Sequence, residues 1–313
     1  MNWQLLLASL ALVGQVHHYV FFNRDRERIS EPTFLETNAF EGAQLKYSWR
    51  QLEPEKDKYN FGEIQHDLAF LKSKGKKLFI QIQDISYDRA IVLVPRYLLI
   101  EPQYHGGADK QYTDKGAEEG WVARRWDPTV RERFQKLLLA LGKEFDGKIE
   151  GINLPETAVD FGEGGRLFPK GFTPEVYVNA VVETMAVLKR AFPKSVAMQY
   201  ANFMTGEGRL TEVYRRAKDL NVGLGGPDLL PYKRWQMRNS YPLLREYAGS
   251  VPTGIAVQDG NYGYIHPNTG KQVTISELIA FGTKYLKVEY IFWCTEEPFY
   301  SRQLIPYLRA HTK

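Results

Sequence analysis

Two kinds of segment alternate along this chain. Eight short runs rich in β-branched and aromatic residues are separated by segments whose apolar residues recur at helical spacing. Strands that alternate with helices pair in parallel, and eight such repeats favour closure into a barrel over an open, doubly wound sheet. We therefore predict a single (β/α)₈ TIM barrel domain over residues 1–313. Its predicted strands are residues 17–23, 43–49, 77–84, 149–156, 195–202, 222–228, 254–259 and 289–294.

The predicted helices carry start and stop signals. Residues 61–74 place apolar side chains on one face and end before Gly75, which suits a left-handed cap. An N-cap residue followed by proline at the first helical position is a typical helix start, and so is a Thr-x-x-Glu capping box. Such starts occur at Asp127-Pro128, at Thr173-Pro174 and at Thr274 with Glu277.

Two long excursions interrupt the alternation, at residues 86–125 and 158–172. Each follows a predicted strand, so both should project from the barrel face at which the strands end. Loops on that face carry the specificity of barrel enzymes.

The N-terminal apolar run, residues 5–13, has two interpretations. It has the length of the hydrophobic region of a signal peptide, although no Lys or Arg precedes it and no clear cleavage site follows. The chain would then be secreted or periplasmic. The run is too short to span a bilayer. The alternative is that residues 1–15 form an N-terminal helix closing the bottom of the barrel in a cytoplasmic protein.

Composition excludes several classes of function. Hydrophobic residues make up 43% of the chain and charged residues 25%, as in ordinary soluble domains. The net charge of +4 is spread without a basic stripe, which argues against nucleic acid as the main partner. Because Cys294 is the only cysteine, no intramolecular disulfide can form. No zinc-binding spacing, P-loop, dinucleotide fingerprint or serine-hydrolase elbow occurs, so we expect no metal, cofactor or membrane partner. The oligomeric state is not predicted.

Polar and aromatic side chains terminate many of the predicted strands. Active sites of such barrels form at these C-terminal strand ends. A buried unpaired charge costs several kcal/mol, so repeated carboxylates there favour binding or catalysis over a structural role. A salt bridge or helix cap is the alternative for each, above all for Asp84 and Asp228. The candidate site consists of Trp49, Asp84, Glu156, Tyr200, Asn202, Asp228, Asp259, Tyr262, Trp293 and Glu297.

One stretch resembles a known family. The segments YSWRQLEP at 47–54, KYNF at 58–61 and GKKLFI at 75–80 resemble the second βα unit of the retaining glycoside hydrolases of clan A. That family has a pattern close to W-x-x-L-E-P-x-x-G-x-Y-D-F there. This chain departs from it with Asp57 in place of Gly and Asn60 in place of Asp. The resemblance covers residues 43–82 and is topological elsewhere.

The resemblance implies roles for two strand ends. It makes Glu156 the acid/base, although Pro155 stands where the family has Asn, with Asn153 two places earlier. The family nucleophile is a Glu closing the seventh strand, where this chain offers Gln258 or Asp259. Strand side chains alternate, so only one of these two can face the barrel mouth. Trp293 resembles the aromatic platform that ends the eighth strand of that family.

We therefore predict a glycoside hydrolase acting on an oligo- or polysaccharide, with Glu156 as acid/base and Asp259 as nucleophile or base. Cleavage needs one carboxylic acid to protonate the leaving oxygen and one carboxylate to form the intermediate or activate water. We expect Trp49, Tyr262 and Trp293 to stack on sugars, and the remaining polar candidates to bind substrate. Two alternatives stay open, namely a non-catalytic glycan-binding barrel, and a metal-dependent lyase or isomerase using Asp84, Glu156, Asp228 and Asp259 as ligands.

Overall fold

The computed structural model describes residues 16–23 and 25–311. The apolar run at 5–13, expected to be a signal peptide or a helix, lies outside the described residues. Within the described part of the chain, no helix is long and apolar enough to cross a membrane.

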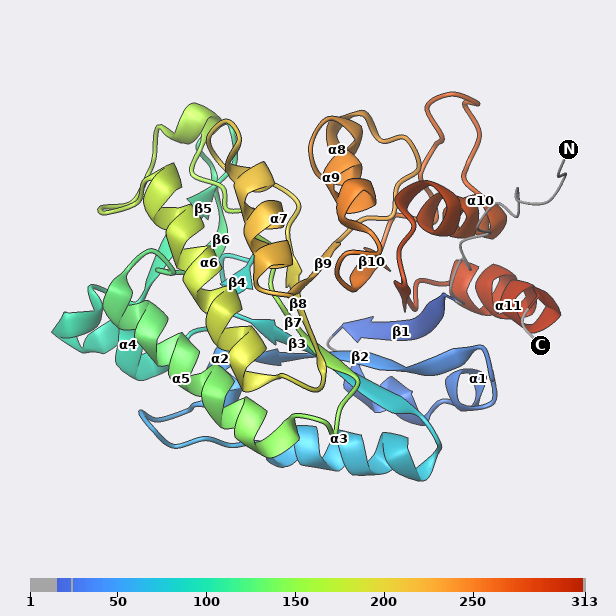
Figure 1. The fold of residues 1–313 in the computed structure, drawn as a ribbon, viewed down its shortest axis with the longest axis horizontal. Coiled ribbons are helices and arrows are strands. Elements are labelled where there is room, and N and C mark those ends of the chain that lie inside the picture. Colours follow the sequence, from blue (N-terminus) through green and yellow to red (C-terminus); the bar gives the residue numbers. More distant parts are fainter. Residues whose placement is uncertain (1–15, 24, 312–313) are drawn as a thin grey trace, which may run out of the picture.

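Eight parallel strands close into a barrel (Figure 1). Around the barrel the order is β1, β2, β3, β7, β8, β9, β10 and β11, with β11 pairing back to β1. The predicted single (β/α)₈ barrel is confirmed. The strands are β1 (His17–Asn23), β2 (Phe40–Ser48), β3 (Lys77–Gln83), β7 (Gly151–Leu154), β8 (Val196–Tyr200), β9 (Gly223–Gly226), β10 (Thr253–Val257) and β11 (Tyr290–Cys294).

Helices surround the barrel, and their predicted caps are present. Asp127 accepts hydrogen bonds from the backbone of Thr129 and Val130, and Thr173 accepts one from Val176. Thr274 and Glu277 form the capping box. The main helices are α3 (Gly62–Ser73), α5 (Pro128–Phe145), α6 (Pro174–Ala191), α7 (Arg209–Asp219), α8 (Arg234–Arg238), α9 (Ser240–Tyr247), α10 (Ile275–Ala280) and α11 (Ile305–His311). A π-helical turn follows α10 at Phe281–Leu286, and another precedes α11 at Tyr300–Leu304.

Aromatic rings fill the lower barrel. Tyr19, Phe79 and Phe292 are fully buried, and the Phe79 and Phe292 rings meet edge to face with centroids 5.0 Å apart. Gly151 makes this packing feasible, because a Cβ at that position would lie 2.6 Å from the Phe79 ring. The bottom of the barrel is therefore a packed core, and polar chemistry is confined to the mouth.

The excursion after β3 folds into a small sheet of its own. Strands β4 (Ile85–Ser86), β6 (Glu118–Ala123) and β5 (Ala108–Tyr112) pair antiparallel in that order. The short helix α4 (Arg96–Ile100) precedes β5. The insertion's 3₁₀ turn at Pro102–Tyr104 packs against α5. The insertion returns the chain to the barrel at Arg125, immediately before α5.

Candidate active site

A polar cleft of about 290 Å³ lies at the C-terminal ends of the barrel strands. Every barrel strand except β11 contributes to its lining, directly or through the residues that follow the strand. The lining residues are Asn23, Lys46, Gln81, Gln83, Ile85, Ser86, Tyr87, Asp88, Pro155, Glu156, Tyr200, Pro227 and Gln258. A larger groove of about 510 Å³, lined by residues 26–30 and 62–70, contains no strand-end residue. The cleft is therefore the candidate active site.

Glu156 follows β7 and is held by Asn202, which follows β8. The Asn202 Oδ1 atom accepts hydrogen bonds from the backbone N–H groups of Phe203 at 3.0 Å and Ala158 at 3.3 Å. This orientation turns the amide nitrogen toward Glu156, and Nδ2 donates to Oε2 at 2.5 Å. The carboxyl group therefore has one defined orientation, and a proton on it belongs to Oε1.

Burial raises the pKa of Glu156 to about 7. The hydrogen bond from Asn202 opposes this rise, the negative charge of Asp228 adds to it, and Lys46 and Arg125 oppose it. A carboxyl group with a pKa near neutrality is partly protonated at pH 7. It can therefore donate a proton and take one back, as a general acid and base must.

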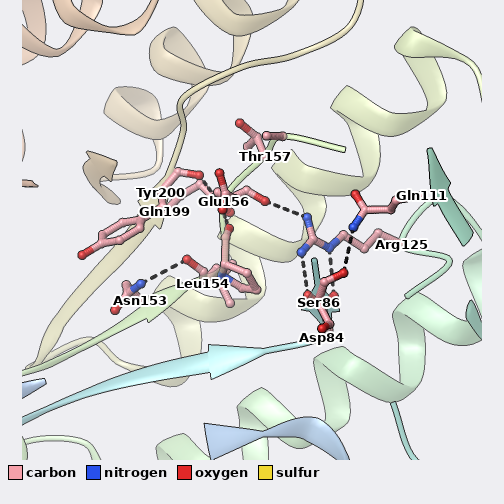
Figure 2. A network of polar contacts seen from close by, with 12 residues as sticks. Asp84, Ser86, Gln111, Arg125, Asn153, Leu154, Glu156, Thr157, Gln199 and Tyr200 are labelled. Carbon is pink, nitrogen blue, oxygen red and sulfur yellow. Dashed lines mark hydrogen bonds and ion pairs between the residues drawn. The ribbon is translucent and has the colours of Figure 1, made fainter. Parts of the chain in front are cut away.

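Arg125 supports the backbone that carries Glu156 (Figure 2). Its Nε and Nη2 atoms donate to the two oxygens of Asp84 at 2.8 and 2.5 Å. Its Nη1 atom donates to the Glu156 carbonyl and to the Tyr177 hydroxyl, both at 2.9 Å. The Tyr177 hydroxyl in turn donates to the Thr157 carbonyl at 3.0 Å. The insertion after β3 thus fixes the position of the acid.

Asp84 does not line the cleft, contrary to the prediction that it binds substrate. It is 2% exposed, and both its oxygens are taken by Arg125. The alternative that its carboxylate forms a salt bridge is the one the structure supports.

Only one of the two residues that follow β10 faces the cleft. Gln258 lines it, whereas Asp259 is exposed and does not. The Asp259 carboxylate lies instead beside Cys294 and Glu296, with donor atoms of all three within 4.8 Å of one another. This corrects the predicted pairing of Asp259 with Glu156. β10 ends at Val257, and of the two residues that follow it only Gln258 lines the cleft.

The three aromatic residues expected to stack on sugars are core residues. Trp49 is fully buried, and its ring packs edge to face on Phe134 of α5, with centroids 5.0 Å apart. Trp293 is fully buried and donates from Nε1 to His18 at 2.9 Å. The Tyr262 hydroxyl donates to the Cys294 carbonyl at 2.9 Å, and the residue is 1% exposed. None of the three lines the cleft, so their prediction as sugar platforms is corrected.

The remaining predicted site residues divide into two groups. Tyr200 lines the cleft, where its hydroxyl accepts a hydrogen bond from Gln44 at 3.0 Å. Asp228 does not itself line the cleft; it follows Pro227 of the lining and acts electrostatically on Glu156. Glu297, in contrast, is exposed and accepts hydrogen bonds from the Ser301 hydroxyl and backbone. It caps the last helical segment and is not part of the cleft.

Several cleft residues were not predicted. Lys46, Gln81 and Gln83 lie on β2 and β3 and point to the cleft at alternate positions. The Gln81 Oε1 atom is buried and has no hydrogen-bond partner within the described residues. The sequence did contain a signal for these residues. Polar residues at every second position of an otherwise apolar strand indicate a polar barrel interior.

The oxygen ligands expected for a metal-dependent enzyme are not brought together. Within residues 16–23 and 25–311, the one group of three donors close enough to share an ion is Asp259, Cys294 and Glu296. It includes neither Asp84, Glu156 nor Asp228.

Comparisons with known proteins bear on the fold alone. No protein-family model matches the sequence, and no curated protein matches it either. Among solved structures, native xylanase 10B from Thermotoga maritima is similar, with a TM-score of 0.54 and 12% identity over 89% of this chain and 82% of that one. Xylanase 10B from Thermotoga petrophila RKU-1 in complex with xylobiose gives 0.49 and 11% over the same shares. At such identity the likeness to the first structure shows a shared barrel fold.

Proposed function

We propose that this protein is a glycoside hydrolase acting on an oligo- or polysaccharide, with Glu156 as the proton donor. The observation that carries the proposal is a carboxyl group with a pKa of about 7 in a polar cleft at the barrel mouth. The fold shared with a xylanase supports it by analogy only, because one barrel architecture hosts many activities.

The geometry of Glu156 suits protonation of a leaving oxygen. Glycosidic bonds break through an oxocarbenium-like transition state in which a carboxylic acid protonates the departing oxygen. With its pKa near 7, a large fraction of Glu156 is protonated at neutral pH. Asn202 bonds Oε2, so the proton on Oε1 is directed to the cleft.

The rest of the cleft offers groups that suit sugar hydroxyls. Asn23, Gln81, Gln83 and Gln258 each present an amide, which both donates and accepts hydrogen bonds as a hydroxyl does. Lys46 adds a cationic donor. A lining rich in amides favours a polyhydroxylated ligand over an apolar one.

The test is hydrolysis of a panel of α- and β-linked 4-nitrophenyl glycosides and of soluble polysaccharides, xylan included. We expect the wild type to cleave at least one of them and Glu156→Gln to lose about 10²–10⁴-fold in kcat. The matched control is Glu207→Gln, which alters an exposed glutamate outside the cleft. Cleavage by Glu156→Gln at the wild-type rate contradicts the proposal, and so does a wild type that cleaves none.

A second candidate is a glycan-binding barrel without turnover. The observation in its favour is that Gln258, an amide, faces the cleft from β10, where clan A hydrolases carry their nucleophile. Titration calorimetry with the oligosaccharides of the panel separates the two functions. Saturable binding by the wild type without release of reducing ends favours the binder.

A further inference from the structure

The proposed hydrolase needs a second carboxylate, and Gln258 cannot supply one. A primary amide neither attacks an anomeric carbon nor deprotonates water at neutral pH, whereas hydrolysis requires a nucleophile or a base opposite the acid. Around the cleft, the carboxylates to consider are Asp88 in its lining and Asp228 at the end of β9. Asp88 accepts a hydrogen bond from the Ala90 backbone in an exposed loop.

Asp228 is tied to two positions that line the cleft. It follows Pro227 directly, and its Oδ1 atom accepts a hydrogen bond from Asn261 Nδ2 at 3.0 Å. The orientation of that amide is fixed, because Asn261 Oδ1 accepts from the Gln258 backbone N–H at 3.0 Å. Through Asn261, the Asp228 carboxylate is therefore connected by hydrogen bonds to the backbone of Gln258. This is the residue that stands where a clan A hydrolase would carry its nucleophile.

The backbone of Asp228 is unusual. Its φ of 65° lies in the left-handed region, which is costly for a residue with a Cβ. Tyr241 stabilises the conformation, since its hydroxyl donates to the Asp228 carbonyl at 2.5 Å and accepts from the Leu230 backbone at 2.9 Å. Strain held in place at a strand end is characteristic of functional positions.

The charge of Asp228 also reaches the acid. Its carboxylate is among the groups that raise the pKa of Glu156. Asp228 is thus coupled electrostatically to Glu156, whereas Asp259 lies with Cys294 and Glu296.

We infer that Asp228 is the second carboxylate of the proposed hydrolase and acts as the base that activates water; the inference rests on the proposed function. Glu156 follows β7 and Asp228 follows β9, with β8 between them. Neighbouring strands lie about 4.8 Å apart, so the backbones of β7 and β9 are separated by about two strand spacings. A base that activates water must stand far enough from the acid to admit a water molecule, as in inverting enzymes, and next-nearest strands are compatible with this.

The reaction is then a single displacement. The water oxygen bonds to the anomeric carbon while Asp228 accepts a proton from that water. The bond to the leaving oxygen breaks on the opposite face, and this oxygen takes the proton of Glu156. One bond forms and one breaks, and exchange of protons with solvent restores both carboxyl groups. The product has inverted anomeric configuration.

The experiment uses the full chain and whichever substrate of the panel it cleaves, together with the 2,4-dinitrophenyl glycoside of the same sugar. We expect Asp228→Asn to lower kcat by about 10²–10⁴-fold on both substrates, because water must be activated in either case. Glu156→Gln should lose far less on the dinitrophenyl glycoside, whose leaving group needs no proton. Sodium azide, which needs no deprotonation, should restore turnover of that substrate by Asp228→Gly. Asp219→Asn, an exposed change on α7, is the matched control.

Folding is checked separately, by thermal melting of each variant. Asn tolerates the left-handed backbone nearly as well as Asp, so Asp228→Asn should melt close to the wild type. Proton NMR of the first product formed by the wild type should show inversion. Any of three results overturns the role of Asp228. These are retention of the anomeric configuration, a kcat of Asp228→Asn within threefold of the wild type, and a loss of activity confined to Asp88→Asn. If the wild type cleaves nothing, the proposed function fails too; if only Glu156→Gln is impaired, this inference alone fails.

Discussion

The ends of β7 and β10 both carry an acidic residue, yet only one of these acids belongs to the cleft. Glu156 is partly buried, hydrogen-bonded by Asn202 and supported through its carbonyl by Arg125. Asp259 is exposed and lies outside the lining, where Gln258 takes its place. The position of a carboxylate at a strand end therefore does not determine its chemistry. Side-chain direction and the groups that surround the carboxylate do.

The difference between Glu156 and Asp259 should have its largest effect on kcat. On a substrate with a poor leaving group, Glu156→Gln should lose about 10²–10⁴-fold, because the amide cannot protonate the leaving oxygen. Asp259→Asn should change kcat less than twofold, since its carboxylate lies with Cys294 and Glu296 and, unlike that of Asp228, is not among the charges that act on Glu156. Initial rates at saturating substrate measure both. A large loss in Asp259→Asn would break the comparison.

The ion pair between Asp84 and Arg125, which supports Glu156, should contribute measurably to the free energy of unfolding. Arg125→Met leaves the buried Asp84 carboxylate without its partner, which typically costs about 3–5 kcal/mol of unfolding free energy. Urea unfolding measures it. The control Arg215→Met removes an exposed pair with Asp219 and should cost less than about 1 kcal/mol. Equal effects of the two variants would mean that the Asp84–Arg125 pair is not structurally important.

On the β11 side, Trp293 should matter for folding and not for sugar binding. Trp293→Ala removes a fully buried ring and should lower the unfolding free energy by about 3–5 kcal/mol. The affinity for any glycan bound by the wild type should stay within threefold, measured by calorimetry below the melting range. A loss of glycan affinity with an unchanged melting temperature would instead support Trp293 as a sugar platform.

The burial of Glu156 predicts a pH-dependent stability. Its pKa is raised from 4.5 unfolded to about 7 folded, so the folded state binds the proton more tightly. The stabilisation is complete below pH 4.5, declines as the pH rises and is lost above pH 7. Relative to Glu156→Gln, the wild type should therefore lose about 2–3 kcal/mol between these pH values. Unfolding curves across this range measure the difference, and Glu207→Gln should show none of it.

The barrel could be predicted from the sequence because its signals are local. Apolar runs marked the strands, with β1 predicted at its observed bounds, and N-cap residues such as Asp127 marked the helix starts. Trp49 shows the limit of such signals. The capping box between Ser48 and Gln51 starts the short helix α2 (Trp49–Leu52) at this residue, and the ring is buried against α5.

The site could be predicted only in part, because it depends on contacts between distant segments. Glu156, Asn202 and Tyr200 were found as strand-end residues. Asp84 was misassigned because its partner, Arg125, lies 41 residues further along the chain. Asp259 was misassigned because β10 ends at Val257, so strand alternation does not extend to residues 258 and 259. Strand ends cannot be placed to one residue from the sequence.

The small sheet inserted after β3 makes the acid dependent on a loop rather than on the barrel scaffold. Arg125, which bonds the carbonyl of Glu156, belongs to the far end of that insertion. A loop graft that replaced residues 85–124 but misplaced Arg125 would leave Glu156 in the chain with its main-chain anchor lost. Anyone engineering this barrel for new substrates should therefore transfer the insertion as one cassette together with Asp84 and Arg125, and should randomise only positions between these two residues.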